Sequence, residues 1–179
     1  MRIQLPKKST NSDNLMKIHV SSALGTGPTQ LSAFDNALIK TGVANYNLLR
    51  LSSVIPPDAE ITEYEGAVPK LPGKWGDRLY AVYAETRTSL PSEEAWAGIG
   101  WVQDPETGQG LFVEHEGHSE QSVKLDITKS LHALLVNRGL PEMPISMNVV
   151  GGVCVDLPIC AFAVAVYQVS DWQNSPQLQ

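Results

Sequence analysis

Two adjacent serines, Ser52 and Ser53, are the residues whose type and setting most directly suggest chemistry in this chain. The apolar residues Leu48, Leu49 and Leu51 precede them, and Val54-Ile55 followed by Pro56-Pro57 comes after. Proline lacks the N–H that a strand ladder needs, so the buried strand that this run predicts must end at the proline pair. A peptide held at the end of a rigid strand can store about 1–3 kcal/mol of strain. The pattern makes the Ser52–Ser53 bond a candidate for self-cleavage, although two small polar residues can also simply end a strand.

Self-cleavage at this bond would begin with attack of Ser53 Oγ on the Ser52 carbonyl, which converts the amide into an ester. β-Elimination would then release Ser52, and hydrolysis would leave a pyruvoyl group in place of Ser53. The products would be a fragment of residues 1–52 and a fragment of residues 53–179 that begins with pyruvate. We therefore treat Ser52 and Ser53 as the candidate cleavage site.

Three blocks of the sequence resemble the pyruvoyl-dependent arginine decarboxylases. They are residues 31–61, which contain Ala33-Phe34-Asp35, Asn45-Tyr46-Asn47-Leu48 and the Ser-Ser motif, residues 110–117, and residues 160–165. The resemblance implies an α+β fold, a four-layer αββα sandwich, assembled as a homotrimer or a dimer of trimers. It also implies decarboxylation of L-arginine to agmatine and CO₂ through a Schiff base to a covalent pyruvoyl group derived from Ser53, with no pyridoxal phosphate and no metal.

The block Gly110–Gly117 supplies the candidate proton donor. Glu114 follows the apolar residues Leu111-Phe112-Val113, where loss of water disfavours a charged carboxylate. Strand alternation places Glu114 and Glu116 on one face and His115 on the other, so the residues alone leave the two acids open. The resemblance selects Glu114 as the catalytic acid.

Asp35 is the candidate for holding the substrate's guanidinium group, because a carboxylate can pair with a guanidinium through two hydrogen bonds. A lone aspartate on a helix is otherwise usually a solvated charge, and the resemblance favours the binding role. It also implies that Asn47 hydrogen-bonds the reacting carbonyl during cleavage. In the family that the sequence resembles, the loop after the first strand closes on the site, which implies contact of Gly25 and Gly27 with the substrate, and Leu31 is a further candidate.

Two other functions are compatible with these residues. The chain could be a pyruvoyl decarboxylase of a different amino acid, which a panel of substrates would distinguish. It could also be an uncleaved, silent member of the same fold that serves as a trimeric scaffold or binding module. Retention of Asn47, Ser53, Asp35 and Glu114 together argues against the silent alternative.

Composition narrows the class of protein. The net charge of −6 and the sequence pI near 5.1 argue against nucleic-acid binding, which requires a basic face. No apolar run reaches the length of a membrane span, and the N-terminus lacks the apolar core of a secretory signal. We expect a cytoplasmic protein without a membrane partner. Cys154 and Cys160 match no zinc spacing and are predicted to be reduced thiols.

The pattern of apolar residues predicts one domain over residues 16–170, between a flexible leader (1–15) and a flexible tail (171–179), with Met16 a candidate for the natural start. Gly25–Pro28 is expected to be a turn, and residues 56–78 a loop with a short extended piece. Helices are expected from about Thr29 to Gly42, with Leu31, Phe34 and Leu38 as the apolar stripe, and from Ser119 to Asn137. Strands are expected at 17–20, 45–55, 79–87, 97–103, 110–115, 144–150 and 159–169.

Overall fold

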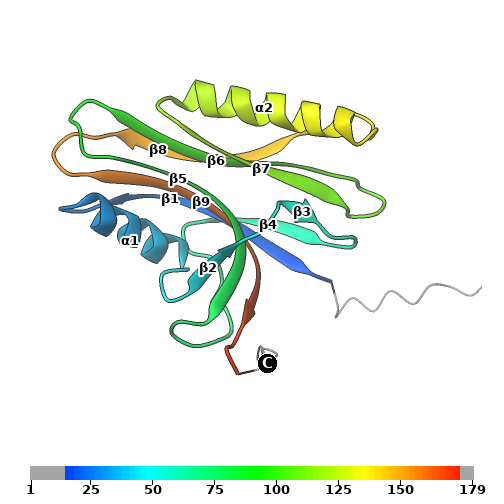
Figure 1. The fold of residues 1–179 in the computed structure, drawn as a ribbon, viewed down its shortest axis with the longest axis horizontal. Helices are drawn as coiled ribbons and strands as arrows, with labels where there is room; N and C mark the ends of the chain where they lie inside the picture. The colour runs from blue at the N-terminus through cyan, green and yellow to red at the C-terminus, as the bar shows by residue number, and fades with distance from the viewer. Residues whose placement is uncertain (1–14, 174–179) are drawn as a thin grey trace, which may run out of the picture.

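Two β-sheets packed face to face form the centre of the domain, and one helix covers the outer side of each (Figure 1). The computed structural model describes residues 15–173. Its elements within this range are β1 (Lys17–Thr26), α1 (Gln30–Thr41), β2 (Asn47–Arg50), β3 (Val54–Ile55), β4 (Glu60–Glu65), β5 (Arg78–Thr88), β6 (Glu94–Gln103), β7 (Gly110–Gly117), α2 (Glu120–Asn137), β8 (Ser146–Val153) and β9 (Ile159–Ser170). The described residues thus form an α+β domain, consistent with the predicted sandwich.

Sheet A has the strand order β2-β5-β9-β1-β4, and sheet B has the order β3-β7-β6-β8. The β1–β4 and β2–β5 pairs are parallel, and the other pairs are antiparallel. Strand β9 lies in the middle of sheet A and is buried from Ile159 to Val166. Its alanines 161, 163 and 165 face sheet B, while Cys160, Phe162, Val164 and Val166 face α1. Burial of both faces explains why this strand reads as an uninterrupted apolar run.

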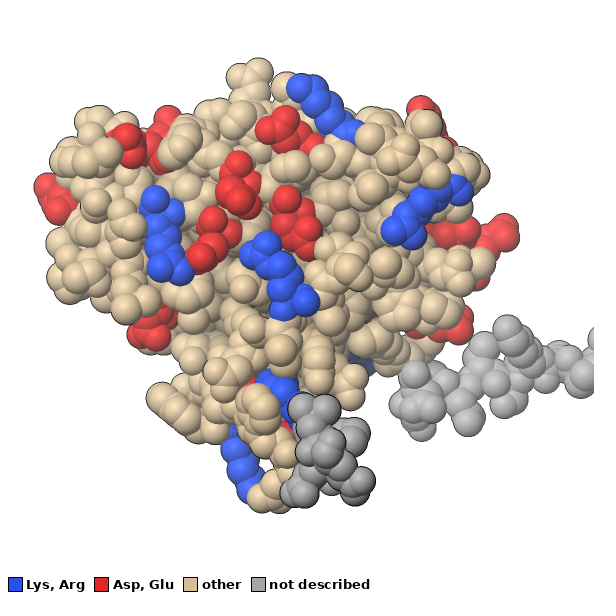
Figure 2. All heavy atoms as spheres, viewed as in Figure 1, with Lys and Arg blue, Asp and Glu red and all other residues tan. Residues whose placement is uncertain are grey.

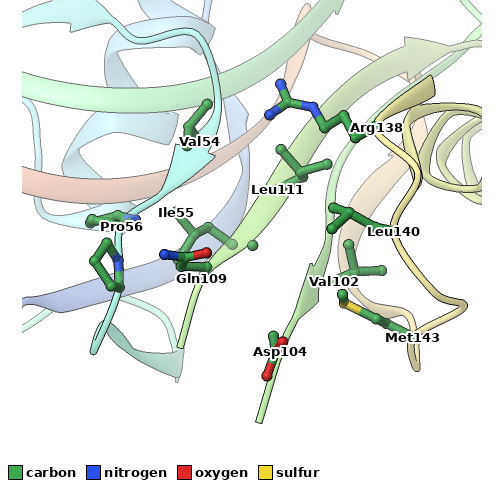
Figure 3. A pocket seen from close by; sticks show the side chains of 12 residues that line it. Val54, Ile55, Pro56, Val102, Asp104, Gln109, Leu111, Arg138, Leu140 and Met143 are labelled. Carbon is green, nitrogen blue, oxygen red and sulfur yellow. The ribbon is translucent and has the colours of Figure 1, made fainter. Parts of the chain in front are cut away.

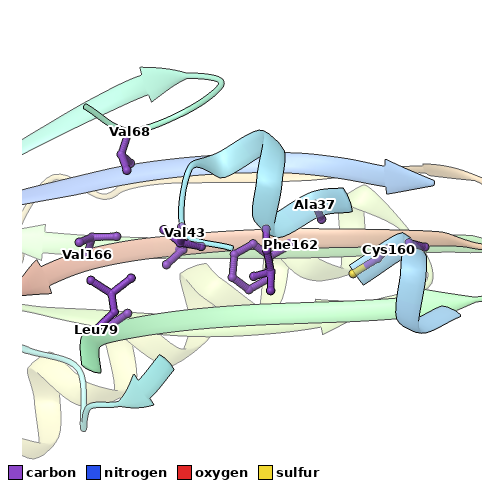
Figure 4. Close-up of a cluster of buried hydrophobic side chains, with 11 residues drawn as sticks. Ala37, Val43, Val68, Leu79, Cys160, Phe162 and Val166 are labelled. Atoms are coloured by element: carbon purple, nitrogen blue, oxygen red, sulfur yellow. The ribbon is translucent and has the colours of Figure 1, made fainter. Parts of the chain in front are cut away.

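The core between α1 and sheet A is built around Phe162 (Figure 4). Ala37 of α1, Val43 after the helix and Leu79 of β5 belong to the same buried cluster, together with Cys160 at its end. Burial raises the pKa of the Cys160 thiol to about 12, so this thiol stays protonated at neutral pH. Cys154 and Cys160 are both free thiols, as predicted.

Helix α1 begins and ends where the sequence predicts, because Thr29 caps its first turn and Gly42 closes it in the left-handed region at φ 83°. The predicted apolar stripe is partly wrong. Leu31 is 68 % exposed, and the buried face consists mainly of Ala33, Ala37 and Leu38. Small residues are needed there because the backbone of α1 approaches β1 closely.

Several element boundaries differ from those predicted. Strand β1 extends six residues beyond Val20 and includes Gly25 and Thr26, which were assigned to a turn. The extended piece expected within residues 56–78 is β4, which pairs in parallel with β1. Helix α2 and the β6–β7 hairpin are confirmed, and α2 buries Val123, Ile127, Leu131 and Leu135 against sheet B.

The surface carries both signs of charge. On the face shown in Figure 2, acidic side chains are interspersed with Lys and Arg side chains, and the basic residues are scattered rather than gathered. Neither helix of the described range combines the length and the apolar character that a membrane-spanning helix requires. The predicted leader lies almost entirely outside the described residues, as does most of the predicted tail.

Candidate functional site

The Ser-Ser motif lies where the chain crosses from sheet A to sheet B, which corrects the prediction of a single buried strand over residues 45–55. At the end of β2, the Leu51 N–H donates to the Ala81 carbonyl of sheet A at 3.0 Å. Two residues later, the Ser53 carbonyl accepts from the Phe112 N–H of sheet B at 2.8 Å. The Ser52–Ser53 peptide is therefore held between two anchored ends rather than within one strand.

Ser53 adopts a backbone conformation that is unfavourable for a residue with a side chain. Its φ is 65°, in the left-handed region, and only Asp58 and Ser92 share a positive φ among the described residues other than glycine. Such a conformation costs on the order of 1–3 kcal/mol and persists only where the surroundings impose it. Here the hydrogen bond from Phe112 and the two-residue pairing of β3 with β7 impose it.

Glu114 is the carboxylate that contacts Ser53. The Ser53 Oγ donates a hydrogen bond to Glu114 Oε1. Glu114 is half-buried and points between the sheets, on the same side of β7 as the core residue Phe112. His115 points the other way, and its Nε2 lies 2.8 Å from Ser130 Oγ of α2. Glu116 shares the face of Glu114 but is exposed, so the structure distinguishes the two acids that alternation left open.

Tyr167 of β9 belongs with Ser53, Phe112 and Glu114 to one group of contacting residues, which we call the Ser53 cluster. The sequence analysis did not identify Tyr167. Its hydroxyl donates to the Val54 carbonyl at 3.1 Å, and its ring meets Phe112 edge-on with centroids 6.1 Å apart. Burial, and then the charge of Glu114, raises the pKa of the Tyr167 hydroxyl above its usual value. Tyr167 could have been identified from its inward position in an apolar strand, because a buried tyrosine hydroxyl normally has a polar partner.

The cluster can hold one serine hydroxyl against a carboxylate and fix the peptide groups on its C-terminal side. Phe112 holds the Ser53 carbonyl, and Tyr167 holds the next one along the chain, that of Val54. These contacts restrict the backbone around Ser53 while its hydroxyl stays next to Glu114. Such an arrangement suits attack by the hydroxyl on a neighbouring carbonyl, and afterwards proton exchange at the same position.

The sequence matches the model of the pyruvoyl-dependent arginine decarboxylases over residues 17–144. The chain belongs to this family. A relative named pyruvoyl-dependent arginine decarboxylase from Thermococcus sibiricus is 32 % identical over 150 residues, which cover 81 % of this chain and 90 % of the relative.

Two further relatives with the same name align over shorter segments. The protein from Halobacterium salinarum is 41 % identical over 99 residues, and that from Methanocaldococcus jannaschii is 40 % identical over 93 residues. These alignments cover 55 % and 51 % of this chain. They span 59 % and 52 % of the respective relatives.

The other residues that the family resemblance nominated lie away from Ser53 within one chain. Asp35 and Leu31 are exposed on α1, which packs on β1, β9 and β5 at the outer face of sheet A. Asn47 is exposed at the start of β2, and its side-chain N–H donates to the Gly76 carbonyl at 2.6 Å. The single chain therefore assembles Ser53 with Glu114, and leaves Asp35, Leu31 and Asn47 outside that cluster.

Gly25 and Gly27 have a packing role in the structure. Both are buried, and a Cβ added at Gly25 would lie 2.1 Å from the Ala33 carbonyl oxygen of α1. A Cβ added at Gly27 would lie 2.4 Å from Ser32 Oγ. The two glycines let β1 and the start of α1 approach each other, and their contact with a substrate stays a prediction. Among residues 15–173, no cluster of His, Cys, Asp and Glu side chains has the arrangement of a metal site.

Proposed function

We propose that this protein is a pyruvoyl-dependent decarboxylase that converts L-arginine to agmatine and CO₂. The main observation that supports the proposal is the conformation of Ser53. Its backbone is in the left-handed region, and its Oγ donates a hydrogen bond to Glu114. Membership of the family supports the substrate and the pyruvoyl group. The four-layer αββα order is part of the same proposal.

Maturation requires the Ser53 hydroxyl to reach the carbonyl of Ser52. The crossover between the sheets supports this step, since Leu51 is tied to sheet A and Ser53 to sheet B. Attack forms the Oγ–C bond and breaks the C–N bond, and the nitrogen takes up a proton. Loss of the Ser53 α-proton then breaks the Cβ–Oγ bond, so that Ser52 leaves as a carboxylate. Hydrolysis of the remaining enamine releases ammonia and leaves the pyruvoyl group at position 53.

The pyruvoyl group supplies an electron sink for decarboxylation, as other carbonyl cofactors do. The residues of the chain are suited to hold it. Phe112 and Tyr167 fix the two carbonyls that follow, and Glu114 lies beside position 53 as the group that holds and returns a proton. The half-buried setting of Glu114, on the same face of β7 as the core residue Phe112, limits competition from water.

Asp35 is the proposed partner of the substrate guanidinium, with Leu31 beside it. Because α1 packs on the outer face of sheet A, away from Ser53 within one chain, we propose that a second copy supplies α1 to the site and that the enzyme is a homotrimer or a dimer of trimers. Asn47 is proposed to approach the reacting carbonyl within the same assembly. Light scattering at the assay concentration checks this arrangement, and full activity in a monomer would contradict it.

Release of CO₂ from a panel of amino acids tests the proposed activity. We expect turnover of L-arginine, with lysine and ornithine far poorer substrates, since neither carries the planar guanidinium that a carboxylate holds through two hydrogen bonds. A clear preference for another amino acid would favour a pyruvoyl decarboxylase of different specificity. An uncleaved protein with no turnover would favour the scaffold or binding module.

Asp35→Asn should weaken arginine binding more than it slows the chemical steps. The substitution keeps the size of the side chain and removes the charge, so we expect KM for arginine to rise about 10- to 100-fold with a small change in kcat. Steady-state kinetics on the cleaved protein measures both, and Asp126→Asn on α2 is a matched control. A KM equal to that of the parent would mean that the guanidinium is held elsewhere.

Tyr167→Phe should slow self-cleavage while leaving the fold intact. The variant keeps the ring contact with Phe112 and loses only the hydrogen bond to the Val54 carbonyl. A net hydrogen bond of about 0.5–1.5 kcal/mol predicts a cleavage rate about 2- to 10-fold lower. The half-time of cleavage after cell-free synthesis gives the rate. Tyr46→Phe, which loses bonds to Leu71 and Pro72 instead, should cleave like the parent. Equal half-times for all three proteins would remove Tyr167 from the site.

A further inference from the structure

A cavity lies beside β3, the strand that follows Ser53 (Figure 3). Its volume is about 230 Å³. The walls come from β3 and the prolines after it, from both strands of the β6–β7 hairpin, and from the segment that follows α2. The lining residues include Val54, Ile55, Val102, Leu111, Leu140 and Met143.

This cavity is separate from the Ser53 cluster. Val54 and Leu111 are paired neighbours on β3 and β7, and they face the side of sheet B that carries α2. Phe112 and Glu114 point to the opposite side, toward sheet A. The two sites therefore share the strand β3 and lie on opposite faces of it.

The cavity carries one charge of each sign. Arg138 caps the C-terminal end of α2 through its backbone, and its guanidinium has no hydrogen-bond, ion-pair or ring partner within residues 15–173. Asp104 lies in the hairpin turn, where its Oδ1 accepts from the N–H groups of Glu106 and Thr107. The other carboxylate oxygen, Asp104 Oδ2, accepts no hydrogen bond from residues 15–173. Figure 3 places Arg138 and Asp104 at opposite ends of the cavity, with Leu111, Leu140 and Val102 between them.

We propose that this cavity is a second ligand site, for a small molecule with a carboxylate at one end, a cationic group at the other and an apolar stem between. Arg138 pairs with the carboxylate, Asp104 pairs with the cation, and the aliphatic wall covers the stem. The volume is below the range of about 300–1,000 Å³ that is typical of pockets for drug-sized ligands, which points to a molecule of amino-acid size. Val54 and Ile55 form one wall, so the bound molecule also packs against the strand that follows Ser53.

The test uses 6-guanidinohexanoate and the full-length protein in isothermal titration calorimetry. This probe has both charged ends and no primary amine, so it cannot form a Schiff base with a pyruvoyl group. We expect saturable binding, weakened about tenfold by Arg138→Gln and by Asp104→Asn, as loss of a charged hydrogen bond predicts. Asparagine can still accept the two hydrogen bonds of the turn, and the Arg138 side chain makes none, so both variants should fold.

Three controls identify the site. Lys129→Gln, on the exposed side of α2, should bind the probe like the parent, and Asp35→Asn should keep the binding that Arg138→Gln and Asp104→Asn weaken. Hexanoate, which lacks the cation, should bind more weakly than the probe and be sensitive to Arg138→Gln alone. Loss of binding in Asp35→Asn only would place the probe at the candidate active site and overturn the proposal. Equal affinities for the parent, Arg138→Gln and Asp104→Asn, or no binding at millimolar probe, would overturn it as well. None of these outcomes depends on decarboxylation.

Discussion

Ser53→Ala should leave the chain in one piece and without decarboxylase activity. The alanine removes the hydroxyl that attacks the Ser52 carbonyl, and with it the only atom from which the ester is formed. Alanine tolerates the left-handed backbone about as poorly as serine, so the strain at φ 65° is retained and the fold should be unchanged. Mass spectrometry under denaturing conditions should therefore give a single species of 19.4 kDa.

Ser52→Ala is the matched control for this variant. Its hydroxyl takes no part in the proposed steps, because only the carbonyl of residue 52 reacts. We expect Ser52→Ala to be cleaved before residue 53 and to release CO₂ from arginine. Cleavage of the Ser53→Ala chain at the same bond, or failure of the Ser52→Ala chain to cleave, would show that the nucleophile has been assigned to the wrong serine.

Glu114→Gln should separate maturation from catalysis. The glutamine carbonyl oxygen can accept the hydrogen bond that Glu114 Oε1 now accepts from Ser53, so the hydroxyl stays in place and cleavage should proceed. Glutamine cannot give up a proton to the substrate carbon, and general acid catalysis typically contributes about 10²–10⁴-fold to a rate. We expect a cleaved protein whose kcat falls by about that factor, measured as CO₂ release.

Glu116→Gln distinguishes the role of Glu114 from a general effect of lost charge. Glu116 lies two residues further along the same face of β7 but is exposed, so its variant should keep nearly the parent rate. If Glu114→Gln is cleaved and still turns over arginine at the parent rate, Glu114 is not the acid. If the variant is not cleaved, Glu114 is the base in maturation, and the proposed division of roles is wrong.

Local patterns predicted most of the elements of this fold. The caps at Thr29 and Gly42, the repeat of Val123, Ile127 and Leu131 in α2, and the apolar run of β9 depend on neighbouring residues in the sequence. The prediction failed where a long-range contact decided the structure. Residues 45–55 read as one strand because nothing local shows that β2 pairs with β5 in sheet A whereas β3 pairs with β7 in sheet B.

Only part of the candidate site follows from the sequence. Ser53 and Glu114 were nominated from the sequence, and the structure joins them by a hydrogen bond across 61 positions of the chain. Tyr167 was missed because its contact with Val54 depends on how the two sheets pack. Leu31 was predicted to lie on the apolar face of its helix, but its side chain is exposed. The spacing of apolar residues alone does not distinguish a face that packs on the core from a face at the surface.

The intact mass of the purified parent protein, measured under denaturing conditions, tests the central claim most directly. Self-cleavage before Ser53 predicts two species, residues 1–52 with a free carboxylate and residues 53–179 with a pyruvoyl group in place of the first serine. The larger species should resist Edman degradation, because pyruvate has no amino group. A single full-length species with a free N-terminus would contradict the proposed pyruvoyl chemistry.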